Sequence, residues 1–297
     1  MGQTAAVRVR VPASSANLGP GFDTLGLALT LYDEVEVALV PGSGPLDVEV
    51  VGECADTVPR NASHLVARAV ATACEGQLPA GLRLRCVNRL PHGRGLGSSA
   101  AAIIAGIIAG QELVGCGRDN DTALQLAATM EGHPDNVAAA LLGGATIAWT
   151  DAQAQAHAVR IDVHPEVRAV ALVPPVPVAT RTARALLPAQ VSHGDAAANA
   201  ARAALLVEAL GHRPDLLLEA TTDRLHQVYR TPAMPESVAL MDSLRGRGVA
   251  AVVSGAGPTV LALTDPDGVD AVVAAAPAGW RAFALEVDRV GATVVSG

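Results

Sequence analysis

The first third of the chain alternates apolar and polar positions in several short segments. Residues 7–11 alternate apolar side chains with Arg, and residues 34–40 and 46–51 alternate acidic side chains with apolar ones. Residues 82–87 continue the alternation with arginines on the polar side. A period of two is typical of strands with one face in the core and one in water. It suits an antiparallel sheet better than a buried parallel one.

Helical patterns follow in residues 98–114, 121–131 and 134–142, and Gly143 and Gly144 provide a stop signal after the last of them. The first of these segments is rich in Ala and Ile. We therefore expect three helices packed against the sheet.

The periodicity is lost between residues 150 and 161, where the chain becomes polar and rich in Ala and Gln. We place a domain boundary there, which divides the chain into residues 1–155 and 156–297. The second part alternates strands with helices without a long parallel series, which predicts an α+β lobe. Its helices are expected at 196–210 and 233–245, and its strands at 168–173, 249–253, 260–264 and 282–287.

The length of 297 residues is about twice that of a usual domain, which agrees with two lobes. The net charge is -8, and all 21 basic residues are Arg because the chain contains no lysine. Mechanisms that require a lysine amine, such as a Schiff base or a Walker-type phosphate lysine, are therefore excluded. The acidic balance also argues against nucleic acid as a partner.

No segment resembles a secretory signal or a membrane span. The longest apolar run, residues 100–110, is shorter than the roughly 20 residues that cross a bilayer. We expect no membrane partner and a cytoplasmic location. The cysteines form no CxxC pairs, and we expect reduced thiols at Cys54, Cys74, Cys86 and Cys116.

Residues 91–101 place three glycines and two serines directly before the Ala- and Ile-rich helix. Glycines let the backbone approach an anion, and a helix N-terminus offers free N–H groups and a positive dipole end. We therefore predict that this loop binds phosphate, and we expect Gly97→Val to abolish ATP binding without disturbing the fold. The predicted nucleotide-binding loop consists of Pro91, His92, Gly93, Arg94, Gly95, Leu96, Gly97, Ser98, Ser99, Ala100 and Ala101.

Two other interpretations of this loop compete with phosphate binding. One is a flexible Gly/Ser turn before a capped helix. The other is a dinucleotide fingerprint, because residues 95–100 satisfy GxGxxA and Asp119 follows at about the right distance. The preceding strand, however, carries Arg instead of being buried and parallel, so the context of the fingerprint is wrong.

Three further segments carry polar groups of interest. Residues 12–23 interrupt strand-forming sequence with small and polar residues, which indicates either a surface loop or a ligand-binding loop. Residues 131–136 gather two carboxylates, an imidazole and an amide at a helix start, as a capped turn also would. Since no HExxH pattern is present, a metal there would be Mg²⁺ held by oxygen ligands. Residues 254–259 form a glycine-rich turn between two apolar strands.

Taken in order, these four segments resemble the family of galactokinase, homoserine kinase, mevalonate kinase and phosphomevalonate kinase. The resemblance spans residues 7–263, and residues 12–23 and 131–136 are most similar to the homoserine kinases. It implies a ribosomal protein S5 domain 2-like N-terminal lobe and a ferredoxin-like C-terminal lobe. It also implies an ATP:L-homoserine O-phosphotransferase that uses Mg²⁺, acts in threonine biosynthesis and forms a homodimer.

The resemblance also implies roles for individual residues. Asp23 would bind the substrate ammonium, and Arg184 and Arg230 its carboxylate, although either arginine could instead be a surface residue. Asn61 would contact adenine or be a simple turn residue. The role of Arg94, either facing solvent or neutralising phosphate, stays open. Further substrate contacts are expected from Asn17, His133, Asn136, Thr180 and Gly255, metal ligands from Glu131 and Ser98, and catalytic roles from Glu131, Asp135 and Asn136.

Asn136 stands near the position where several related kinases have an aspartate base. An amide cannot accept the proton, so we expect positioning, Mg²⁺ and the helix dipole to supply most of the catalysis, with Asp135 as the alternative base.

Rival functions are a superfamily kinase acting on a sugar or mevalonate-type alcohol, a non-catalytic binding protein on this fold, and a nucleotide-dependent oxidoreductase. Asp23 together with two arginines favours an amino-acid substrate.

Overall fold

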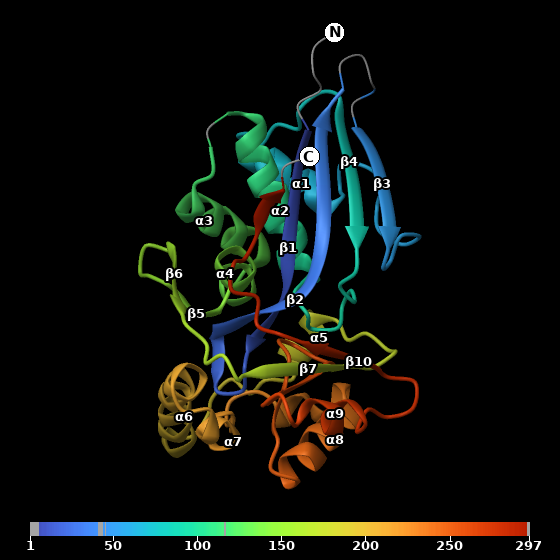
Figure 1. Ribbon diagram of the computed structural model, residues 1–297. Coiled ribbons are helices and arrows are strands. Elements are labelled where there is room, and N and C mark those ends of the chain that lie inside the picture. Colours follow the sequence, from blue (N-terminus) through green and yellow to red (C-terminus); the bar gives the residue numbers. More distant parts are fainter. Residues whose placement is uncertain (1–5, 41–43, 45, 116, 296–297) are drawn as a thin grey trace.

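Two long antiparallel strands, β1 (Ala6–Asn17) and β2 (Gly21–Leu39), form the centre of the first sheet. The computed structural model describes residues 6–40, 44, 46–115 and 117–295. The strands follow the order β11-β1-β2-β4-β3, and β5 pairs with the first half of β2 (Figure 1). The other strands of this sheet are β3 (Leu46–Gly52), β4 (Leu82–Asn88), β5 (Ala145–Thr150), β6 (Ala156–Ile161) and β11 (Thr293–Val295).

The alternation in the sequence correctly predicts a half-solvated sheet. The register places Arg8, Glu36, Arg85 and Glu49 side by side across four adjacent strands, so that charges of opposite sign alternate on the outer face. Neighbouring apolar positions such as Val37 are fully buried on the inner face. β4 is antiparallel to β2, as expected, but parallel to β3.

Helices cover the inner face of this sheet (Figure 1). α2 lies against α1, and a Cβ on its Gly106 would stand 2.5 Å from the Cβ of Ala69, so glycine is required for this close approach. All three predicted helices are confirmed, with bounds within two residues of those expected. The helices of this lobe are α1 (Leu65–Ala73), α2 (Ser98–Leu113), α3 (Asn120–Glu131) and α4 (Asp135–Leu142).

The second lobe contains an antiparallel sheet with the strand order β10-β7-β9-β8. The chain runs from β7 through helices to β8 and β9, and then through α9 to β10, which is the ferredoxin-like connection. The strands are β7 (Arg168–Val173), β8 (Ala250–Val253), β9 (Val260–Thr264) and β10 (Arg281–Leu285). The helices are α5 (Thr180–Ala185), α6 (His193–Gly211), α7 (Leu217–Ala220), α8 (Pro235–Gly246) and α9 (Val269–Val273), with 3-10 turns η1 (Pro214–Leu216) and η2 (Val228–Ala233).

The expectation of a loop at residues 12–23 is wrong in part. Residues 12–17 extend β1, and β2 begins at Gly21, so a tight turn of three residues joins two paired strands. Ser14 and Ser15 are both fully buried there. The strand has no alternating pattern because small residues are buried on both of its faces.

Residues 150–161, where periodicity is lost, form the end of β5, a turn and β6, and this hairpin belongs to the first sheet. Near the C-terminus, β11 also returns to pair with β1 (Figure 1). The first sheet therefore takes strands from both sides of the predicted boundary, and the division at residues 155 and 156 stays a prediction.

Within the part of the chain that the structure describes, no helix is long and apolar enough to cross a membrane. Cys54 and Cys86 are free thiols, the Cys74 thiol donates to the Gly110 carbonyl, and Cys116 lies outside the described residues.

The buried Asp33 ties the end of β4 to β2. Its Oδ1 accepts backbone N–H groups of Arg89 at 2.6 Å and Leu90 at 2.9 Å, just before the glycine-rich loop. Burial raises the pKa of Asp33 to about 6, although these hydrogen bonds oppose the shift. The folded protein therefore holds a proton that the unfolded chain has lost, and stability should fall as the pH rises from about 4 to 6.

We predict that Asp33→Asn removes this slope, because the amide keeps an acceptor oxygen without the charge. Relative to the wild type, the variant should gain on the order of 1–3 kcal/mol of unfolding free energy between pH 4 and pH 7, measured with urea. The exposed Asp47→Asn is the matched control. Parallel stability curves for the wild type and Asp33→Asn would contradict the prediction.

Candidate active site

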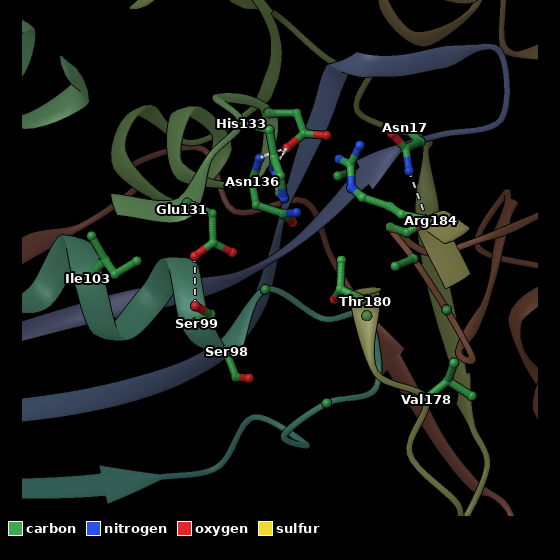
Figure 2. Close-up of a pocket in the computed structure, with 18 of the residues that line it drawn as sticks. Asn17, Ser98, Ser99, Ile103, Glu131, His133, Asn136, Val178, Thr180 and Arg184 are labelled. Carbon is green, nitrogen blue, oxygen red and sulfur yellow. Dashed lines mark hydrogen bonds and ion pairs between the residues drawn. The ribbon is translucent and has the colours of Figure 1, made fainter. Parts of the chain in front are cut away.

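A cavity of about 430 Å³ lies where the two lobes meet. Both glycine-rich loops, the α3–α4 junction and the start of α5 line it, and Figure 2 shows side chains from these segments pointing into it. The structure thus brings together residues from widely separated parts of the sequence. The predicted site residues that line the cavity are Asn17, Gly93, Gly95, Gly97, Ser98, Ser99, Glu131, His133, Asp135, Asn136, Thr180, Arg184, Arg230 and Gly255.

The loop at residues 91–101 has the conformation expected of an anion site. Gly93, Gly95 and Gly97 have φ angles of 65°, 82° and 68°, a left-handed region that favours glycine. α2 begins directly after Gly97, and no side chain caps its N-terminus. The free N–H groups of its first turn and the positive end of its dipole are therefore available to a phosphate.

The glycines also let three segments pack closely. A Cβ at Gly95 would stand 2.3 Å from the carbonyl oxygen of Ser254, and one at Gly97 only 2.0 Å from Ser14 Oγ. Gly93 is more open, with Pro177 Cβ at 3.4 Å as its nearest contact. The expectation that Gly97→Val spares the fold is therefore wrong, because the added side chain would collide with β1.

Arg94 has neither of the two roles considered for it. Its guanidinium donates to the carbonyl oxygens of His92 at 2.9 Å, Pro174 at 3.1 Å and Pro175 at 2.6 Å. The backbone N–H of Val178 also donates to the carbonyl of Gly93. Arg94 thus fastens the loop to the beginning of the second lobe instead of facing a phosphate or solvent.

Five other residues of the predicted loop do not line this cavity, and four of them are enclosed by protein. Pro91, Leu96, Ala100 and Ala101 are buried in the protein interior. They shape the loop through packing and not through direct ligand contact.

Glu131, at the end of α3, faces the N-terminus of α2. Ser99 Oγ donates to Glu131 Oε2 at 2.6 Å, and Ser98 lies beside them at the cavity wall (Figure 2). No group of three or more His, Cys, Asp or Glu residues in the described ranges could hold a metal by itself. One carboxylate with neighbouring hydroxyls nevertheless fits Mg²⁺, because this ion prefers oxygen ligands and usually takes only one or two carboxylates from the protein.

The α3–α4 junction presents His133, Asp135 and Asn136 to the cavity (Figure 2). Asp135 Oδ1 accepts from His133 Nδ1 and from the Asn136 backbone N–H, each at 2.7 Å. Burial opposes the charged imidazole, but the Asp135 and Glu131 carboxylates outweigh it and raise the pKa of His133. Asp135 is thereby engaged in holding its neighbours.

Two arginines, Arg184 and Arg230, also line the cavity. Arg184 forms a two-pronged ion pair with Asp23, at 2.5 and 3.0 Å. Arg230 is 1% exposed and donates to the Gly255 carbonyl at 2.6 Å, while its Nε has no partner among the described residues. Burial and the nearby Arg184 lower the pKa of Arg230 to about 10, so it remains charged at neutral pH. An anionic ligand would satisfy this cation.

Comparison with known proteins identifies the family. The model of the GHMP kinase N-terminal domain matches residues 64–144, and that of the GHMP kinase C-terminal domain matches residues 198–282. The chain belongs to the GHMP kinase family.

The sequence similarity between this GHMP kinase and individual relatives extends over almost its whole length. A homoserine kinase from Streptomyces coelicolor is 57% identical, covering 99% of this chain and 96% of that protein. A homoserine kinase from Corynebacterium efficiens is 48% identical, covering 95% and 93% respectively.

Solved structures agree with the two-lobed α+β fold. The crystal structure of homoserine kinase from Cytophaga hutchinsonii has a TM-score of 0.87 at 26% identity, covering 99% of each chain. A mevalonate pyrophosphate decarboxylase from Streptococcus pyogenes has a TM-score of 0.70 at 16% identity, covering 97% of this chain and 98% of that one, and thus shares the fold.

This GHMP kinase has a second cavity, of about 250 Å³, next to the first, and the two share Leu65, Gly93, Ser98 and Ser99. His64 and His92 line it, and burial lowers the pKa of both, so both imidazoles are neutral at neutral pH. Predominantly apolar walls beside a phosphate-binding loop suit a flat heterocycle.

Asn61 lies outside both sets of lining residues. Its Oδ1 accepts from the backbone N–H and the hydroxyl of Ser63 at 2.9 and 2.7 Å, as in a turn. Its predicted contact with adenine stays a prediction.

Sequence reasoning missed several residues that shape the site. The Phe22 ring centroid lies 5.5 Å from the Arg184 guanidinium carbon and 5.8 Å from that of Arg230, so the ring supports both cations. Arg68, on α1, lines the cavity near the glycine-rich loop. Ser14 lies beneath Gly97. The absence of lysine indicated that an arginine would serve as the phosphate cation but did not single out Arg68, and only the fold reveals Arg68, Ser14 and Phe22.

We predict that Gly97→Ala destabilises the protein by about 3 kcal/mol or more, because its Cβ has no space against β1. The matched Gly93→Ala should cost about 1–2 kcal/mol, mainly from the left-handed backbone. The two unfolding free energies can be measured with urea at pH 7. Equal losses for the two variants would contradict the close packing of Gly97 on Ser14.

Proposed function

We propose that this protein is a homoserine kinase, which transfers the γ-phosphoryl group of ATP to the side-chain hydroxyl of L-homoserine. The observation that carries the proposal is the arrangement of charge along one cavity. A backbone anion site lines the same cavity as Arg184, which is paired with Asp23, and Arg230, which has no ion-pair partner among the described residues. Full-length relatives that bear the name homoserine kinase support it.

The nucleotide would occupy both cavities. Its phosphates would lie on the glycine-rich loop at the N-terminus of α2, and its adenine in the neighbouring apolar cavity beside His64. Arg68 would supply the cation that contacts the phosphates, because the donors of Arg94 are engaged with carbonyl oxygens. Its guanidinium makes no ion pair within the described ranges, so it is free to contact a phosphate.

Glu131, Ser98 and Ser99 would hold Mg²⁺ at the junction of α2 and α3. When bound, the ion neutralises charge on the β- and γ-phosphates. The Glu131 carboxylate is already oriented for this role by its hydrogen bond from Ser99.

The amino-acid part of the substrate would bind between Asp23 and the two arginines. Its carboxylate supplies the anion that Arg230 lacks and also reaches Arg184, while its ammonium replaces Arg184 as the partner of Asp23. A zwitterion inserted in this way produces an alternating row of charges and leaves none of them unpaired.

The substrate hydroxyl would then lie near His133 and Asn136, facing the γ-phosphate. The oxygen attacks phosphorus, the bond to the β-phosphate oxygen breaks, and the hydroxyl proton passes to a γ-phosphate oxygen. ADP and O-phospho-L-homoserine are the products. Asn136 cannot accept a proton and Asp135 Oδ1 holds two neighbours, so alignment and charge stabilisation supply the catalysis.

Three finer expectations belong with this proposal. The product would serve threonine biosynthesis, the enzyme would act in the cytoplasm, and two copies would associate as a homodimer. The full-length similarity to homoserine kinases supports the first, and the other two remain predictions.

We predict that phosphorylation requires both charges of the substrate. kcat/KM for L-homoserine should exceed that for 4-hydroxybutyrate or 3-amino-1-propanol by on the order of 10⁴-fold, because each analogue leaves a buried charge unpaired. An ATP-consumption assay over these compounds, L-threonine, galactose and mevalonate provides the measurement. Preferred turnover of galactose or mevalonate would refute the proposed substrate.

Arg184→Gln should reduce this preference for a zwitterion. Arg181→Gln is its matched control, because Arg181 lies on the same helix but does not line the cavity.

Arg68→Gln should raise the KM for ATP about 10-fold with little effect on the KM for L-homoserine, and the difference should shrink in high salt. Arg247→Gln, at the exposed end of α8, removes the same charge far from the cavity. Equal ATP affinity in the wild type and Arg68→Gln, measured by calorimetry, would exclude a phosphate contact by Arg68.

A further inference from the structure

The last four residues of β1 carry three buried polar side chains, of which Ser14 bonds α4, and Ser15 and Asn17 bond the loop at residues 254–255. Ser14 Oγ donates to Asn136 Oδ1 at 3.0 Å, Ser15 Oγ accepts from Ser254 Oγ at 2.8 Å, and Asn17 Nδ2 donates to the Gly255 carbonyl at 2.8 Å. Of the three bonds, only that of Ser14 ends on a side chain of the α3–α4 junction.

The bond from Ser14 determines how the Asn136 amide is oriented. Ser14 is 0% exposed, and Asn136 Oδ1 is the acceptor for its hydroxyl. Within the described residues Ser14 Oγ donates to Asn136 Oδ1 alone, and if the amide turned over, its NH₂ group would face the hydroxyl and this acceptor would be lost. Leaving a buried donor unsatisfied costs about 1–3 kcal/mol, so the observed orientation is strongly favoured.

In that orientation the amide presents only donors to the cavity. Asn136 lines the cavity, its oxygen is held by Ser14, and its Nδ2 makes no hydrogen bond within the described part of the chain. An N–H group can bind a phosphate oxygen or the substrate hydroxyl oxygen and stabilise negative charge on it, but it cannot remove a proton.

We propose that Ser14 is a positioning residue that keeps Asn136 Nδ2 directed at the reacting oxygen atoms. This inference rests on the proposed phosphoryl transfer and adds the group that orients the amide. Ser14 acts through Asn136 and does not touch the substrate.

The close contact between Ser14 and the glycine-rich loop suggests a competing role. A Cβ at Gly97 would stand 2.0 Å from Ser14 Oγ, so the hydroxyl also lies against the nucleotide-binding loop. A purely structural Ser14 would support this loop and thereby ATP binding. A positioning Ser14 would affect the transfer step and only in the presence of the Asn136 side chain.

A double-mutant cycle separates these roles. We expect kcat to fall about 100-fold in Asn136→Ala and about 10-fold in Ser14→Ala, with the KM for ATP within about twofold of the wild-type value in Ser14→Ala. The double variant should have the kcat of Asn136→Ala, because Ser14 has nothing left to orient.

Ser15→Ala is the matched control, since it removes the adjacent buried hydroxyl, whose partner is Ser254 and not Asn136. In the Ser15→Ala, Asn136→Ala double variant, the fold-loss of kcat should equal the product of the two single losses, because the two residues act independently. Thermal unfolding of Ser14→Ala and Ser15→Ala should show similar losses of stability, which separates the kinetic coupling from general loosening.

Two results would overturn the positioning role. One is multiplicative loss of kcat in the Ser14→Ala, Asn136→Ala double variant. The other is an unchanged kcat with a raised KM for ATP in Ser14→Ala. If the wild-type enzyme phosphorylates a different alcohol, the proposed substrate is wrong, but the same cycle run with that alcohol still decides the role of Ser14.

Discussion

The geometry of the cavity depends on the buried polar end of β1. Beyond Ala13 the strand carries hydroxyl and amide groups into the interior, where each must find a partner because unsatisfied burial is costly. The partners lie on α4 and on the loop around Gly255, and Gly97 packs directly against Ser14. One strand end therefore sets the relative positions of the glycine-rich loop, the α3–α4 junction and the second lobe.

Because the chain contains no lysine, arginines supply the cations of the site, and three of them differ in what they bind. Arg94 binds carbonyl oxygens, Arg184 is paired with Asp23, and Arg230 is buried with no ion-pair partner among the described residues. These three guanidiniums have the same chemistry and differ only in their neighbours. The free energy of desolvating a cation without a carboxylate makes Arg230 the strongest indication of an anionic substrate group.

The local pattern of apolar and polar residues was sufficient to predict a strand where one face of the strand is buried and the other is solvated. The charge rows through Arg8 and Glu36 alternate in the sequence because their strands have two different faces. The pattern was insufficient at residues 12–17, where both faces are buried, and at residues 156–161, where most side chains are partly or fully exposed. A period-two signal requires a clear difference between the faces; residues 12–17 have none, and in β6 the inner face is only partly buried.

The sequence by itself determined the chemical groups of the site, because glycine spacing, a helix start and the presence of carboxylate, amide and guanidinium are local properties. Only the tertiary structure decided which of these groups face one cavity. Asn136 and Arg230 line it, whereas Arg94 and Asn61 do not. The physical reason is that proximity between Asn17, Asn136 and Gly255 arises from packing between distant segments, which no local pattern encodes.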